Sequence, residues 1–172
     1  MFDMIRFFGE EFENVYCDRG ITVKRRQRID SDEWADVTTD DWANVICRLK
    51  SGISADVRIS RSVSTEKDSI EFYVIGSNGA LRFIYSCGKQ KLLRCVGEEV
   101  KTNIFRELEI PEEYKTGGQS RSFIDLLKGT PDQYAAAISE GIYSQAAVDA
   151  AKLSSQTGRA VAISELFGES AK

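Results

Sequence analysis

The sequence predicts an α+β protein with a largely antiparallel, open-faced sheet of five to six strands and helices packed on one face of it. Two observations indicate this class. Between Trp42 and Ile110, short runs of alternating polar and apolar residues are joined by short glycine-containing turns. From Gln119 onward, apolar residues recur at helical spacing instead. Strands joined by such short turns pair antiparallel, because parallel strands need a long crossover connection.

The chain opens with a helical pattern, "MFDMIRFFGE", in which Phe2, Ile5 and Phe8 are expected to form the buried face. No Ser, Thr, Asn or Asp precedes this stretch as a cap. Two extended runs follow on either side of Asp18-Arg19-Gly20. The next segment, "DSDEWADVTTDD", is strongly acidic and favours a solvated connector.

Two hairpins form the centre of the predicted sheet. "WANVICRLKSGISADVRIS" turns at Ser51-Gly52, and "SIEFYVIGSNGALRFIYS" turns through "GSNG", whose residues tolerate positive φ. "KLLRCV" and "NIFRELEI" complete the series. One sheet face carries a mixture of charged, aromatic and aliphatic side chains, namely Ile46, Arg48, Asp56, Arg58, Glu71, Tyr73 and Arg82. Such a face is either exposed to solvent or an interface, and the pattern favours neither.

The C-terminal third is predicted to be helical. "SRSFIDLLKG" reads as a short amphipathic helix ending at Gly129. A longer, alanine-rich helix is expected to begin with Thr130 as its cap and Pro131 in its first turn, and to stop at Gly158. "RAVAI" follows as a last short strand.

The 172 residues are expected to form a single domain, 1–172. A net charge of −4 weighs against a nucleic-acid partner or an anionic membrane surface. With no signal-peptide pattern and no apolar run long enough to cross a bilayer, a cytoplasmic protein without a membrane partner is expected. The four cysteines lack CxxC spacing, so reduced, buried thiols are favoured.

The chain contains no histidine, which excludes Ser-His-Asp and Cys-His catalysis and most zinc sites. Neither GxGxxG nor GxxxxGK[ST] is present, and the acidic connector lacks the spacing of a calcium loop. The basic run at Lys24, Arg25, Arg26 and Arg28 fits either phosphate contact or an edge strand protected from aggregation, and the second is favoured. No metal site or catalytic constellation is predicted from these patterns.

Four phrases, in order, resemble a known family: "TDDWANVICRLKSGISADVRISR", "YVIGSNGALRF", "EIPEEY" and "QAAVDAAKLSSQTGRAVAI". They are similar to the C-terminal domain of the glucose–fructose oxidoreductase / inositol dehydrogenase / MocA family. That resemblance implies an open-sheet domain like the C-terminal domain of dihydrodipicolinate reductase. It also implies part of an NAD(P)-dependent oxidoreductase for a sugar, cyclic polyol or related compound, forming a homodimer or higher homo-oligomer through the open sheet face.

The resemblance also implies which functional residues this chain contains. The family commonly carries His-x-x-Asp on a helix, and Asp3 matches its Asp, so the matching His would lie immediately before Met1. The catalytic Lys and the glycine-rich loop for NAD or NADP would belong to an N-terminal Rossmann domain absent from this chain. No catalytic, cofactor-binding or metal-binding residue is then expected here, and the isolated chain is expected to be inactive. Asp3 and Arg61 are the expected substrate-binding residues.

Other readings stay open at this point. Asp3 also fits a helix-start acid that interacts with the helix dipole, and Arg61 also fits a plain surface charge. The chain as a whole also fits a complete, non-catalytic module that uses its sheet to dimerise or to bind a partner. A small hydrolase that relies on carboxylates is a third class, and no paired-acid spacing supports it.

Overall fold

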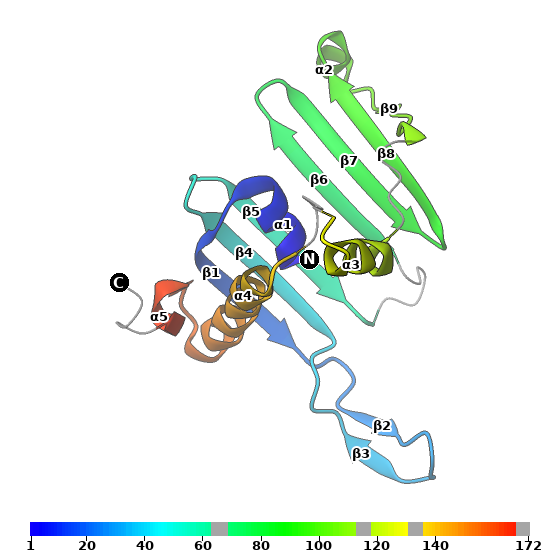
Figure 1. Cartoon of the computed structure of the whole chain (residues 1–172). Coiled ribbons are helices and arrows are strands. Elements are labelled where there is room, and N and C mark those ends of the chain that lie inside the picture. Colours follow the sequence, from blue (N-terminus) through cyan, green and yellow to red (C-terminus); the bar gives the residue numbers. More distant parts are fainter. Residues whose placement is uncertain (63–68, 113–117, 131–135, 168–172) are drawn as a thin grey trace. The chain divides into compact units, whose positions relative to one another are not determined.

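The computed structural model describes residues 1–62, 69–112, 118–130 and 136–167. The chain divides into two compact units (Figure 1): Met1–Ser62 with Ala136–Lys172, and Val63–Ala135. Within the described residues, each unit contains one four-stranded antiparallel sheet. The predicted α+β class with antiparallel, open-faced sheets is confirmed. The strands are distributed over two sheets instead of forming one run of five or six.

The first unit contains a sheet with the order β10-β1-β4-β5. Its strands are β1 (Phe12–Gly20), β4 (Trp42–Leu49), β5 (Ser54–Ser60) and β10 (Val161–Ala162). The hairpin between β4 and β5 turns where the sequence predicts, and Gly52 adopts the positive φ of 85° that the turn needs. The short strand predicted from "RAVAI" is confirmed as β10, which pairs with Asn14 and Val15 of β1.

Helix α4 (Ile138–Thr157) covers one face of this sheet (Figure 1). The sheet contributes alternate residues to the core: Phe12, Val15, Cys17, Val45, Cys47, Leu49 and Val57. The helix contributes buried alanines at 146, 147, 150 and 151. These small side chains let the helix backbone lie close to β1. The helix ends at Gly158, as predicted, with a left-handed φ of 69°.

The start of α4 differs from the prediction. Ala137 is the residue before the helix and is extended, so Thr130 does not cap it. Pro131 lies outside the described residues. The sequence before Ile138 also has a helix-like pattern, but such a pattern does not fix the residue at which the helix begins.

Helix α1 (Phe2–Gly9) is confirmed, but its buried face differs from the prediction. Ile5, Arg6 and Gly9 are buried, whereas Phe8 is 55% exposed. Gly9 explains the difference, because a Cβ there would lie 2.4 Å from Leu49 Cδ2. The helix therefore meets the sheet along the line from Ile5 to Gly9, which turns Phe8 away.

A small ribbon of β2 (Arg25–Gln27) and β3 (Trp34–Asp36) extends beyond the ends of β1 and β4 (Figure 1). The acidic segment was expected to be a plain connector, but it contains β3. Its cross-strand partner β2 belongs to the basic run that was interpreted as an edge strand. No residue of the two strands is buried.

The second unit contains a sheet with the order β6-β7-β8-β9. Its strands are β6 (Ile70–Gly76), β7 (Gly79–Ser86), β8 (Lys89–Val96) and β9 (Arg106–Glu107). The turn predicted from "GSNG" is confirmed. Gly79 is required there, because it has a φ of 145° and a Cβ would lie 2.2 Å from the carbonyl oxygen of Cys95.

The described ranges contain three further helices, all of them short. Helix α3 (Gln119–Leu127) agrees with the predicted amphipathic helix before Gly129. Helices α2 (Glu98–Thr102) and α5 (Ser164–Phe167) were not expected, since each is too short to show a helical period. No helix among the described residues is long and apolar enough to cross a membrane.

The cysteines agree with the prediction at three of four positions. Cys17, Cys47 and Cys95 are buried free thiols, while Cys87 is exposed. Burial raises the pKa of Cys47 to about 12, so this thiol stays protonated and unreactive at neutral pH.

Candidate functional site

Asp3 lies on the exposed side of α1, and its Oδ1 accepts a 3.4 Å hydrogen bond from Ser144 Oγ on α4. One helical turn later, Phe7 is 66% exposed. Residues four apart share a helix face, so Asp3 and Phe7 present a carboxylate beside an aromatic ring. The sequence analysis singled out Asp3 but missed Phe7. The four-residue spacing between Asp3 and Phe7 could have indicated that the two residues share a helix face.

Arg6 attaches α1 to α4. Its side chain is only 5% exposed, and Nη1 lies 3.0 Å from the carbonyl oxygen of Glu140 and 2.8 Å from that residue's carboxylate. The same guanidinium also pairs with Glu11 and lies 5.1 Å from the ring centre of Tyr143. The hydrogen bond to Glu11 raises the pKa of Arg6, so the group stays charged.

The contacts of Asp3 and Arg6 form one interface. Arg6 follows Asp3 by three residues on α1, and Ser144 follows Glu140 by four on α4, so each pair occupies one helix face. The buried arginine therefore fixes the side of α1 that presents Asp3. A binding residue is positioned best when buried contacts hold its element rigidly.

Arg61 lies just beyond β5, where its backbone N–H donates to the carbonyl oxygen of Asp41 at 2.7 Å. Its side chain is exposed. Among the described residues, no hydrogen bond or ion pair joins Arg61 to Asp3. The structure therefore positions the two predicted substrate-binding residues on α1 and after β5, without direct contact.

An open groove of about 650 Å³ lies along α4 and α5. Its lining is mainly apolar: Ile138, Ile142, Ala146, Leu166 and Phe167. Gln145 and Asp149 add polar groups, and the hydrogen bond from Gln145 lowers the pKa of Asp149. Neither Asp3 nor Arg61 lines this groove, so it is separate from the predicted substrate-binding residues.

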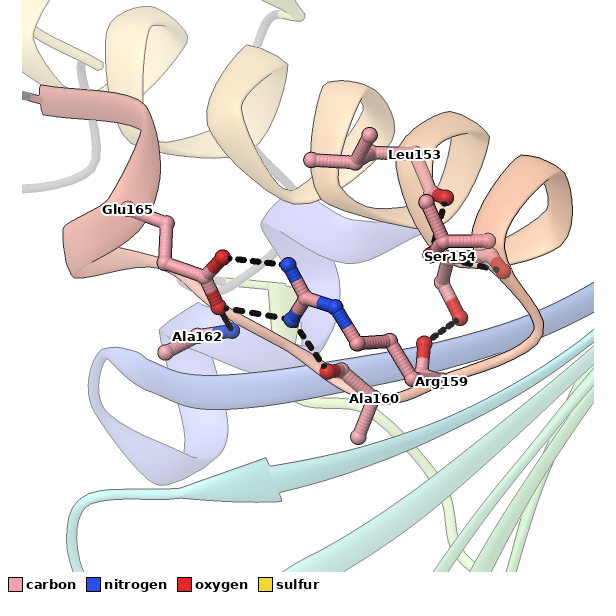
Figure 2. Close-up of polar contacts among 7 residues, drawn as sticks. Leu153, Ser154, Arg159, Ala160, Ala162 and Glu165 are labelled. Atoms are coloured by element: carbon pink, nitrogen blue, oxygen red, sulfur yellow. Dashed lines mark hydrogen bonds and ion pairs between the residues drawn. The ribbon is translucent and has the colours of Figure 1, made fainter.

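The chain segment after α4 contains a cluster of polar contacts (Figure 2). The Arg159 guanidinium faces the Glu165 carboxylate, with nitrogen–oxygen distances of 3.0 and 2.6 Å. Glu165 also accepts the backbone N–H of Ala162 at 2.9 Å. These bonds, the one from Arg159 foremost, lower the pKa of Glu165 to about 2. Every charged group of the cluster is paired, so we assign it to holding β10 and α5 in place.

The described residues contain neither a Rossmann-type dinucleotide unit nor a cluster of metal-ligating side chains. All of their strand pairs are antiparallel, whereas the dinucleotide-binding unit needs parallel strands joined through a helix. Within the same described ranges, no group of three or more Asp, Glu or Cys side chains is placed to hold a metal ion.

Comparison with solved structures shows the fold. An NAD-binding oxidoreductase from Klebsiella pneumoniae matches with a TM-score of 0.76 and 16% identity, covering 94% of this chain and 48% of that one. An oxidoreductase domain protein from Kribbella flavida matches with a TM-score of 0.75 and 20% identity, with coverages of 94% and 48%. Levoglucosan dehydrogenase in complex with NADH gives a TM-score of 0.75 and 17% identity, with coverages of 94% and 47%.

The chain spans about half the length of these structural relatives. A search of curated proteins found no match. A comparison with protein families found one match, in which the model of the GFO/IDH/MocA C-terminal domain matches residues 1–82. The resemblance inferred from the sequence is thereby confirmed over residues 1–82, which match the model of the GFO/IDH/MocA C-terminal domain, and the fold of the chain agrees with about half of each oxidoreductase compared.

Proposed function

We propose that this chain is the substrate-side and oligomerisation domain of an NAD(P)-dependent oxidoreductase that acts on a sugar, a cyclic polyol or a related compound. The observation that carries the proposal is the match of 94% of the chain to about half of an NADH-bound dehydrogenase. Related solved complexes contain L-sorbose or NAD⁺ with L-tartaric acid, both polyhydroxylated compounds. In the proposed whole protein, a separate N-terminal Rossmann domain binds NAD or NADP.

In this proposal the chain contributes substrate binding. The Asp3 carboxylate accepts hydrogen bonds, and a substrate hydroxyl donates them. The exposed ring of Phe7 offers apolar area one turn away, suited to the C–H face of a sugar ring. Arg6 holds α1 against α4 and so keeps these two groups in place. Arg61 is kept as a second substrate contact in the proposal, supplied from the end of β5.

The proposal is tested with a protein extended upstream along its own reading frame. The extended protein should bind NAD(H) and form NADH with at least one member of a panel of sugars and cyclic polyols. Asp3→Asn should raise KM by about tenfold, the usual value of one hydrogen bond to a charged group, with Asp56→Asn as the control. The 172-residue chain alone should show no heat of NADH binding in calorimetry. Tight NADH binding by that chain would contradict the division of roles.

A second candidate is a complete, non-catalytic protein that uses its sheet to dimerise or to bind a partner. The exposed face of the first unit's sheet favours it, because Ile46 is 57% and Tyr16 is 41% exposed on adjacent strands. Charged neighbours Arg48, Asp56 and Arg58 surround this apolar pair. The first candidate requires an open reading frame that continues upstream of Met1, and the second does not. Both candidates predict a homo-oligomer that forms through the open sheet face.

We also infer a cytoplasmic location. Cys17, Cys47 and Cys95 are free thiols that are buried in strands. Disulfides form and persist in oxidising compartments, so unpaired thiols fit a reducing one. Mass measurement of protein purified without reductant, with and without alkylation, tests this inference: four alkylated thiols after denaturation are expected, and a disulfide would contradict it.

A further inference from the structure

The ribbon of residues 21–39 has no core of its own. Its ladder consists of three residue pairs between β2 and β3. Ile29 at its tip is fully exposed, and Trp34 is 59% exposed. An isolated two-stranded ribbon is marginally stable at best in water. An exposed tryptophan on such a ribbon is the type of side chain that dominates binding energy at protein interfaces.

The base of the ribbon is firmly anchored. Asp41 is only 4% exposed, and its Oδ2 accepts the backbone N–H groups of Thr22 and Val23 at 2.8 and 2.9 Å. Its Oδ1 pairs with Arg26 at 3.1 Å. These bonds, led by the one from Val23, lower the pKa of Asp41, so the carboxylate stays charged. The ribbon is thus held in a defined direction although its own residues are exposed.

The charges of the ribbon are segregated between its two arms. The outgoing arm is basic, with Lys24, Arg25, Arg26 and Arg28, and the returning arm is acidic, with Asp30, Asp32, Glu33 and Asp36. One ion pair joins β2 to β3 directly among the described residues, between Arg25 and Asp36 at 3.4 Å, and both side chains are more than half exposed. The ribbon therefore has a basic edge and an acidic edge.

This arrangement selects a partner. A polyanion such as nucleic acid would attract the basic edge and repel the acidic one, and a basic protein would do the reverse. A second copy of the same ribbon, stacked on the first about a twofold axis parallel to the strands, places each basic edge over an acidic edge. Such an isologous contact satisfies both edges at once. It would also remove Trp34 and Ile29 from water.

We propose that the ribbon of residues 21–39 is a contact surface between two copies of this chain, with Trp34 and Ile29 buried at the contact and its two charged edges paired in opposite order. The proposal does not depend on the proposed function. It is also separate from the open sheet face, and two different isologous contacts on one chain would build a tetramer from dimers.

The first test removes the apolar anchors. Trp34→Ser combined with Ile29→Ser should weaken self-association in sedimentation velocity by at least about tenfold, as expected for the loss of hot-spot residues. Val100→Ser, an exposed apolar residue on α2, is the matched control. The melting midpoint should stay unchanged, because no residue of the two strands contributes to a core. A wild-type chain that is monomeric at high micromolar concentration would overturn the proposal.

The second test uses charge. One variant makes the ribbon acidic through Lys24→Glu, Arg25→Glu and Arg28→Glu, and the other makes it basic through Asp30→Lys, Asp32→Lys and Glu33→Lys. When either variant is measured by itself, it should lose the ribbon contact, because edges of the same charge then face each other. An equimolar mixture should recover it. Arg26 and Asp41 are unchanged in both variants, so the base stays intact. Variants that associate as wild type does, or a mixture that stays dissociated, would overturn the proposal.

Discussion

Ser154 joins α4, β1 and the chain segment after the helix through one fully buried hydroxyl. In the described residues, β10 pairs with β1 only at Asn14 and Val15. The backbone N–H of Cys17, further along β1, therefore needs another acceptor. Ser154 Oγ accepts that N–H at 2.9 Å. The same hydroxyl donates to the carbonyl oxygen of Arg159 at 2.6 Å, as Figure 2 shows. The hydroxyl thus satisfies two backbone groups that the sheet leaves unpaired.

Ser154→Ala should lower the free energy of unfolding by about 1–3 kcal/mol, because a buried N–H and a carbonyl lose their partner. Urea unfolding followed by circular dichroism measures this change. Ser155→Ala is the matched control, because its hydroxyl makes no hydrogen bond among the described residues. Equal stability of the two variants would show that water replaces the missing hydroxyl.

Glu165 gives a pH-dependent contribution to stability. Its pKa is about 2 in the folded chain, against an ordinary value of 4.5, mainly because Arg159 donates hydrogen bonds to it. A lowered folded pKa stabilises the fold above the unfolded pKa, and this stabilisation is lost as pH falls from about 4.5 toward 2. Glu165→Gln should therefore flatten the decline of unfolding free energy between pH 5 and pH 2, relative to Glu98→Gln. Parallel pH curves for the two variants would contradict this assignment.

At the same scale, the sequence supports some residue assignments and hides others. The inward positions of β4 could be predicted because polar and apolar residues alternate there. The burial of Arg6 could not be predicted, because a charged residue on a short helix is usually exposed. Its partner Glu140 lies 134 residues further along the chain, and only the packing of α1 on α4 brings the two together.

Among the elements, the ribbon depends most on a single anchor. Asp41→Ala removes the acceptor for Thr22 and Val23 and the partner of Arg26. Amide hydrogen exchange in Arg25–Gln27 should become at least about tenfold faster, the factor expected for losing one charge-assisted hydrogen bond. Amides of β4 should keep their protection. Asp36→Ala, which removes an exposed ion pair, is the control and should change exchange far less. Uniform loss of protection across β1 and β4 would instead show that Asp41 supports the whole sheet.

Element types were predicted better than element limits. Both hairpins, α1, α3 and β10 are where the local pattern indicates. The sequence pattern did not predict β3, because acidic residues are uncommon in strands. No residue of β2 or β3 is buried, so the alternation of polar and apolar residues that marks a half-buried strand is missing there. The pattern also started α4 too early, since Ala136 and Ala137 suit a helix and yet lie outside it.

At the scale of the whole molecule, the exposed sheet faces lead to a prediction of self-association. Ile46 on β4 and Tyr73 on β6 are 57% and 44% exposed, each beside charged neighbours. Ile46→Asp or Tyr73→Asp should weaken the proposed homodimer by at least about tenfold while leaving the melting midpoint within a few degrees of wild type. Analytical ultracentrifugation measures the association, and Ile138→Asp on α4 is the control. A chain that sediments as a monomer at high micromolar concentration would contradict this prediction.

The resemblance to the family could be seen in the sequence because the similar stretches coincide with the β4–β5 hairpin, the β6–β7 hairpin and the end of α4. Those stretches are constrained by turns and by close packing, as at Gly79 and Ala147, so their residues identify the fold. The substrate could not be inferred in the same way. Asp3 and Arg61 lie on different elements, and no short motif joins them.

We propose above that this chain is one part of a longer oxidoreductase whose dinucleotide site lies in another domain. The most direct measurement is the DNA sequence upstream of the Met1 codon in the source genome. We expect an open reading frame in phase with Met1, a His codon immediately before it, and a glycine-rich dinucleotide loop further upstream. An in-phase stop codon directly before Met1, preceded by a ribosome-binding site, would contradict it.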